Sequence, residues 1–97
     1  MDIGEKNAIE HVWEAKETLT EAGYGEAIYL PGGDLSYVAH QLTGDGYVQV
    51  TVYPKADIEA DTAEWIDVGD DELINPSDTA IRQVNSSGTT VLCVRCQ

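Results

Sequence analysis

Residues 35–53 read LSYVAHQLTGDGYVQVTVY, with apolar and polar side chains alternating on both sides of a central run of turn-forming residues. That run is Thr43–Gly46, and its two glycines allow the backbone angles that tight turns need. Alternation over about four to eight residues is typical of a strand with one buried face. The sequence therefore predicts strands over 35–42 and 47–53 that pair antiparallel across this turn.

Further strands are expected on both sides of this pair. Residues 26–31 read as a strand that ends at the turn signal Pro-Gly-Gly-Asp. Later in the chain, 79–84 and 89–95 flank Asn-Ser-Ser-Gly and predict a second hairpin. Residues 65–68 predict a short strand, and the acidic, alanine-rich segment 55–64 predicts a loop or a short helix.

The first segment of the chain follows a different period and predicts a helix over residues 5–22. Its apolar residues recur at helical spacing: Ile9, Val12, Trp13 and Leu19. We expect this helix to cover the apolar face of the sheet. The predicted fold class is therefore α+β, with residues 1–97 forming one domain in which an N-terminal helix packs on a mainly antiparallel sheet of about five strands.

Pairing across the two predicted turns divides the sheet residues into two faces. The apolar face carries Ile28, Leu30, Leu35, Tyr37, Ala39, Val48, Val50 and Val52. The other face is mixed, and its candidates for contact with a ligand or partner are Tyr29, His40, Tyr47, Gln49 and Tyr53. This mixed face has three open uses: packing against the second half of the chain, contact with a second subunit, or a small-ligand site.

The sequence offers no complete catalytic or metal-binding set. His40 lacks a carboxylate on its predicted face that could orient it as an acid or base. Cys93 and Cys96 have the spacing of half a zinc site, but residues three apart on a strand point to opposite faces. We therefore expect no catalytic residue, no metal and no cofactor, and the sequence favours a protein that is not an enzyme.

Charge is the strongest feature of the composition. Asp and Glu number 18 against 5 Lys and Arg, which gives a formal net charge of −13. The acidic residues are dispersed along the chain, and in this the composition resembles that of proteins from halophilic archaea, whose cytoplasm holds molar potassium salt. The alternative explanation is an acidic partner for basic proteins.

The same features limit localisation and partners. Direct binding to nucleic-acid phosphates needs clustered Lys and Arg, which the chain lacks. Without a signal peptide or an apolar run of about 20 residues, a cytoplasmic protein with no membrane contact is expected. The sequence thus predicts a small acidic non-catalytic interaction domain that forms a homodimer. The alternatives are a small-ligand-binding protein or minor enzyme that uses the Tyr/His face, and an acidic partner of a basic protein.

If the charge reflects a salty environment, screening should stabilise the fold. We expect the melting temperature to rise by roughly 10 °C or more between 0.1 and 2 M potassium chloride, because the Debye length falls from ~10 Å to below ~3 Å. Calorimetry across that range measures the effect. A melting temperature that does not change with salt would contradict the halophilic interpretation.

Overall fold

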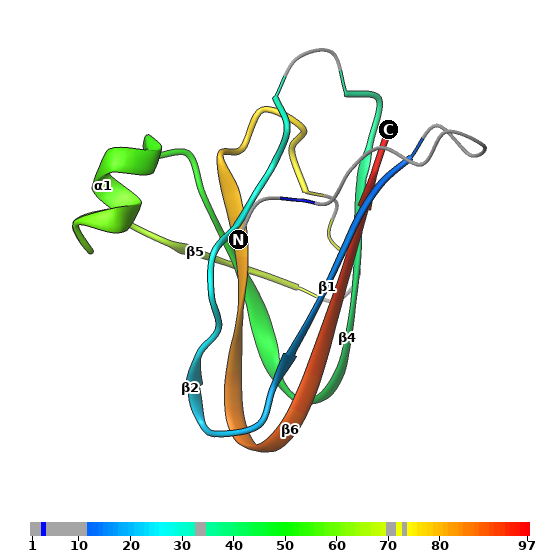
Figure 1. Ribbon diagram of the computed structural model, residues 1–97, viewed down its shortest axis with the longest axis vertical. Coiled ribbons are helices and arrows are strands. Elements are labelled where there is room, and N and C mark those ends of the chain that lie inside the picture. The colour runs from blue at the N-terminus through cyan, green and yellow to red at the C-terminus, as the bar shows by residue number, and fades with distance from the viewer. Residues whose placement is uncertain (1–2, 4–11, 33–34, 70–71, 73) are drawn as a thin grey trace.

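The computed structural model describes Ile3 and residues 12–32, 35–69, 72 and 74–97. Within these residues the protein is mainly β: six strands form one antiparallel sheet, accompanied by one short helix, α1 (Lys55–Glu59) (Figure 1). The strands are β1 (Trp13–Leu19), β2 (Gly23–Tyr24), β3 (Ile28–Tyr29), β4 (Val38–Thr51), β5 (Ile66–Val68) and β6 (Ala80–Cys96). Their order in the sheet is β1-β6-β4-β5, and β2 and β3 also pair with β6.

The two long strands, β4 and β6, bend together and fold the sheet on itself. Their pairing runs from Val38↔Cys96 to Thr43↔Val91 and resumes from Gly46↔Asn85 to Thr51↔Ala80. From the pair Thr43↔Val91 to the pair Gly46↔Asn85, β4 advances by three residues and β6 by six. Strand β6 therefore follows the longer path around the corner. Figure 1 shows both strands turning back at the same end of the molecule.

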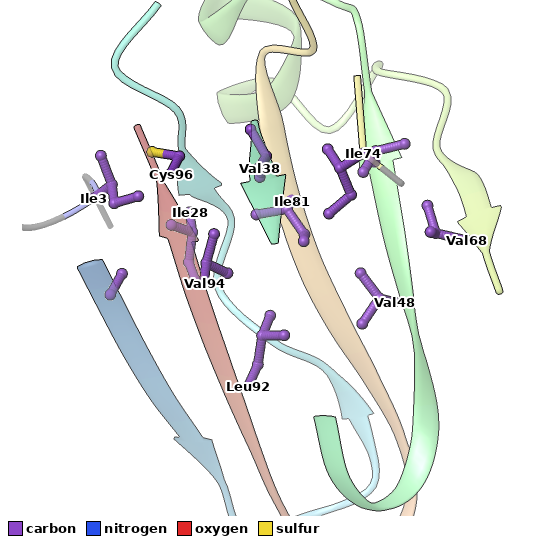
Figure 2. Packing of buried hydrophobic residues seen from close by; sticks show 12 residues of the cluster. Ile3, Ile28, Val38, Val48, Val68, Ile74, Ile81, Leu92, Val94 and Cys96 are labelled. Atoms are coloured by element: carbon purple, nitrogen blue, oxygen red, sulfur yellow. The ribbon is translucent and has the colours of Figure 1, made fainter. Parts of the chain in front are cut away.

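The corner divides the sheet into two layers. The first layer consists of β1 with residues 91–96 and 38–43. The second layer consists of residues 46–51 and 80–85 with β2, β3 and β5. Apolar side chains from both layers meet between them, as Figure 2 shows. The buried cluster contains Ile3, Ala15, Ile28, Val38, Val48, Val50, Val68, Ile74, Ile81, Leu92, Val94 and Cys96.

Glycines make the corner possible. A Cβ on Gly46 would overlap the carbonyl oxygen of Val84, and one on Gly44 would lie 2.6 Å from the Thr89 oxygen. Gly44 and Gly88 also have φ angles of 98° and 73°, which side-chain-bearing residues rarely adopt. The two backbones can therefore approach and bend only where side chains are absent.

A polar network crosses the core next to this corner. Glu17 is only 8% exposed, and its Oε1 accepts a hydrogen bond from Gln83 Nε2 at 2.7 Å. Its Oε2 accepts one from the Glu26 backbone N–H at 2.8 Å, and Thr90 Oγ1 donates to Gln83 Oε1 at 2.5 Å. Glu17 lies in the first layer and Gln83 in the second, so these bonds join the layers and fix how they are aligned.

The expected α+β fold with an N-terminal helix is wrong. Residues 13–19 form strand β1, whose burial alternates residue by residue; residues 5–11 of the expected helix lie outside the described part of the chain. The alternation was hard to recognise because Glu17 occupies an inward position, where the polar network of the core binds its carboxylate. With a charge at that position, the remaining apolar residues fitted a helical spacing.

The two expected hairpins are also wrong, because each of their turn signals lies inside one long strand. The Thr43–Gly46 run bends β4 and the Asn85–Gly88 run bends β6, while the two strands stay paired with each other. The sequence signals marked the right positions, since glycine permits both a hairpin turn and a strand corner. They did not determine which strand lies next to which.

This difference changes which residues are buried. Through the corner of β4, even-numbered residues face the core on both sides, so Val38 is buried together with Val48 and Val50. Three residues that were expected in the core are instead exposed: Tyr37, Ala39 and Val52. Two shorter predictions are confirmed, since β5 lies within 65–68 and α1 within 55–64. No helix among the described residues is long and apolar enough to span a membrane.

Replacing Gly46 with alanine should destabilise the fold strongly. The new methyl group meets the Val84 backbone, which cannot move without separating β4 from β6. We expect a loss of about 3 kcal/mol and a melting temperature lower by more than about 10 °C. Gly69→Ala is the matched control, because a Cβ there meets only the flexible Glu72 side chain. Equal melting temperatures for the two variants would show that the corner tolerates side chains.

Candidate functional site

Side chains on the outer face of the second layer form rows, because directly paired residues of neighbouring strands share a face. One row consists of Tyr24, Val84 and Tyr47. The next consists of Arg82, Gln49 and Asp67. A third row, Tyr29, Ala80 and Thr51, adjoins the segment around α1, and there Thr51 Oγ1 donates a hydrogen bond to the Glu64 carbonyl oxygen at 2.7 Å. This third row is largely buried, so the first two rows form the accessible part of the face.

Arg82 lies at the centre of the accessible part and is held there by several contacts. Its guanidinium carbon lies 4.2 Å from the centre of the Tyr24 ring and 4.1 Å from that of Trp65. Its Nε donates a hydrogen bond to Gln49 Oε1 at 2.9 Å, and Gln49 Nε2 donates in turn to Asp67 Oδ1 at 2.9 Å. Cation–π contacts and a shared hydrogen-bond network fix the side chain in one position.

Opposing effects act on the charge of Arg82. Burial lowers the pKa of the guanidinium, while the Asp61 carboxylate, and the Tyr24 and Tyr47 phenols once they ionise, act to raise it. Because the pKa of an arginine side chain lies far above physiological pH, Arg82 keeps its positive charge throughout the physiological range. The surface therefore presents a permanent, immobilised cation.

We define the Arg82 surface as Tyr24, Tyr47, Trp65, Arg82 and Val84. Tyr24 is 64% exposed and Tyr47 is 39% exposed, so two aromatic rings face solvent beside the cation. In the chain as a whole, aromatic residues make up only 7%, and lysine and arginine together number five. This one surface thus gathers three aromatic rings and one of the few cations.

The structure separates the five residues that the sequence singled out. Tyr47 belongs to the Arg82 surface, Gln49 binds Arg82, and Tyr29 lies in the buried row of the same face beneath Lys55, whose Nζ is 4.7 Å from the ring centre. Tyr53 lies beyond the end of β4, where Glu64 raises the pKa of its phenol. His40 pairs with the buried Val94 in the first layer and points toward the core side.

Sequence reasoning missed Tyr24, Trp65 and Arg82. Tyr24 lies just after the expected helix, and Arg82 lies in the strand 79–84 of the expected terminal hairpin, where the sequence gives it no partner. A usable signal existed in the scarcity of basic residues, because an arginine in a predicted strand of so acidic a chain needs a partner. Its aromatic partners come from β2 and from the residue before β5, and only the three-dimensional fold brings them together.

The outer face of the first layer lies on the opposite side of the molecule. Its rows are Glu14, Arg95 and Ala39; Lys16, Cys93 and Gln41; and Thr18, Val91 and Thr43. Cys93 is the middle residue of the middle row, while Cys96 is fully buried in the core. The two thiols therefore point to opposite faces, as their spacing predicts, and neither is in a disulfide bond.

Other concave or acidic regions offer little chemistry. A shallow, mostly apolar depression of about 250 Å³ lies at the end of the molecule opposite the corner, lined by Ser36, Tyr37, Val38, Ile74, Asn75 and Pro76. Among the described residues, no group of three or more His, Cys, Asp or Glu side chains is arranged to hold a metal ion. The Arg82 surface is therefore the best-organised candidate site in the described part of the chain.

Comparison of the chain with models of protein families, with curated proteins and with solved structures found no match. The candidate site is accordingly assigned from its geometry alone.

The two thiols should differ sharply in reactivity. Cys93 is partly exposed, whereas burial shields Cys96 and raises the pKa of its thiol, which lowers the thiolate fraction. We expect a maleimide reagent to label one thiol per native chain and the second only after addition of denaturant. Mass spectrometry of digested protein should place the native label on Cys93. Equal labelling of both residues in the folded protein would contradict the described core.

Proposed function

We propose that this chain is a small non-catalytic protein-interaction domain that acts as a homodimer, and that the Arg82 surface is its contact surface. The observation that carries the proposal is the fixed Arg82 side chain between the exposed Tyr24 ring and Trp65. We also propose that the protein works in the cytoplasm of a salt-accumulating cell, which is the environment that its composition favours.

The composition of the Arg82 surface supports a protein partner. Tyrosine, tryptophan and arginine are the residues most enriched at energetically dominant positions of protein interfaces, since each buries a large area and keeps a polar group available. Tyr24, Tyr47, Trp65 and Arg82 supply this set on one contiguous part of a sheet face. The Gln49 bond and the ring contacts hold Arg82 before any partner arrives, which reduces the entropy lost on binding.

The geometry gives less support to a small-ligand site or an enzyme on the Tyr/His face. His40 belongs to the first layer, whereas Tyr29, Tyr47 and Gln49 belong to the second. Tyr29 is covered by Lys55 and lies in the mostly buried row. A sheet face with exposed aromatic rings suits contact with another protein surface better than it suits enclosure of a small molecule.

A matched pair of tyrosines tests the proposal, because Tyr47 and Tyr37 are both 39% exposed and only Tyr47 lies on the Arg82 surface. In 2 M potassium chloride we expect a species of twice the 10.5 kDa chain mass. Tyr47→Ser should weaken the dimer about 10-fold or more, as loss of a central interface tyrosine does, while Tyr37→Ser leaves it unchanged. Sedimentation velocity over a concentration series measures both constants.

A monomer at every concentration would remove the homodimer. Equal effects of the two tyrosine substitutions would show that the Arg82 surface is not the contact surface.

A further inference from the structure

Arg82 is one end of a polar row that crosses three strands of the second layer. The strand register places Arg82 on β6 opposite Gln49 on β4, and Gln49 opposite Asp67 on β5. Gln49 links the other two side chains, since its Oε1 accepts a hydrogen bond from Arg82 Nε and its Nε2 donates one to Asp67 Oδ1, each at 2.9 Å. The row therefore carries a positive charge at one end, a neutral amide in the middle and a negative charge at the other end.

Both ends of this row keep unused hydrogen-bonding capacity. Among the residues that the structure describes, none accepts a hydrogen bond from the Arg82 Nη atoms and none donates one to Asp67 Oδ2. Neither side chain forms an ion pair within that part of the chain, and Asp67 is exposed to solvent. Arginine Nη groups bind carboxylates strongly, often through two parallel hydrogen bonds. Each end of the row thus lacks the kind of partner that the other end supplies.

We infer that the partner of the Arg82 surface is a second copy of this chain, related by a two-fold axis that runs along β4, so that Arg82 of each copy binds Asp67 of the other. The inference rests on the proposed function and specifies the contact and the orientation of its interface. A half-turn about this axis reverses the order of the row, which brings each charged end over the opposite end of the other copy.

Charge selects this orientation over the other two-fold arrangement of the same face. An axis across the strands would keep the order of the row and place Arg82 against Arg82 and Asp67 against Asp67 of the two copies. Like charges in direct contact oppose association, whereas the axis along β4 forms two opposite-charge pairs at once.

The same axis gives Tyr47 a partner. Tyr47 precedes Gln49 by two residues on β4, so both side chains project from the same face over the axis. A residue on a two-fold axis meets its own copy, and the two Tyr47 rings, each 39% exposed, would pack on each other beside the Arg82–Asp67 pairs. Burial of the rings excludes water from these pairs.

The overall charge of the chain makes local pairing decisive. Two copies at −13 each repel, so association is favoured where opposite charges meet and where salt screens the remainder. The paired groups touch within one Debye length, which is about 3 Å at 1 M salt, so their contacts persist when the general repulsion is screened.

A charge-swap mixture in 2 M potassium chloride tests the arrangement. In an Arg82→Glu homodimer both reciprocal contacts become acid against acid, and in an Asp67→Lys homodimer both become base against base. We expect each variant alone to dimerise about 10-fold or more weakly than the unaltered chain, because like charges then meet at close range. An equimolar mixture should restore association, since the heterodimer contains one native and one reversed pair. Sedimentation of a fluorescently labelled variant titrated with the other measures this.

Glu14→Lys is the matched control, because it makes the same change in net charge as Asp67→Lys but lies on the outer face of the first layer. We expect this variant to dimerise as the unaltered chain does. Circular dichroism of each variant shows whether it remains folded. Should a charge reversal prevent folding, Asp67→Asn keeps an oxygen for Gln49 and removes only the charge, and it should still weaken the dimer while Glu14→Gln does not.

The outcomes separate the pairing from the surface assignment. Folded variants that fail to associate when mixed, while Tyr47→Ser still weakens the native dimer, would overturn the Arg82–Asp67 pairing and leave the Arg82 surface as the contact surface. Equal weakening by Asp67→Asn and Glu14→Gln would overturn the pairing in the same way. Efficient linkage of two native chains through Cys93 by a short bis-maleimide would place the dimer on the first layer and overturn both.

Discussion

Close approach of the β4 and β6 backbones at the glycine corner is the constraint on which the rest of the structure depends. Gly46 has no room for a Cβ, and Gly44 and Gly88 adopt φ angles that favour glycine. Because both strands bend at the same place, one sheet becomes two layers with a shared core. The same bend puts the faces that carry Arg82 and Cys93 on opposite sides of the molecule.

The polar network beside the corner shows why part of the fold could not be predicted from sequence. Glu17 points inward, so strand β1 lacks the apolar alternation that identifies a strand. Burial of the Glu17 carboxylate is tolerated because each of its oxygens accepts a hydrogen bond, Oε1 from the Gln83 side chain and Oε2 from the Glu26 backbone N–H. Gln83 is separated from Glu17 by 66 residues, and pairing over such a distance cannot be recognised from local patterns.

Some predictions that depended on local chemistry succeeded, whereas the N-terminal helix, which rested on local periodicity, and the two hairpins, which required the right strand pairing, were wrong. The glycine runs did mark changes of chain direction, and the short strand after Trp65 was found at its correct position. Tyr47 and Gln49 were correctly grouped on an outer face because neighbouring residues of one strand obey a simple alternation. Arg82 was missed because its partners, Tyr24 and Trp65, lie on segments whose positions follow only from the complete sheet.

The pairing order of the sheet also bears on how the protein folds. Among the described strands, β1, β2, β3 and β4 all pair with β6, which follows them in the chain, and β5 pairs with β4 instead. Contacts between segments so far apart in sequence give a high contact order, and proteins of that kind fold slowly because long loops must close first. Until residues 80–96 are in place, four strands expose unpaired edges to other chains. In a cell, the acidic residues on strands that are not yet paired would repel other incompletely folded copies of the chain.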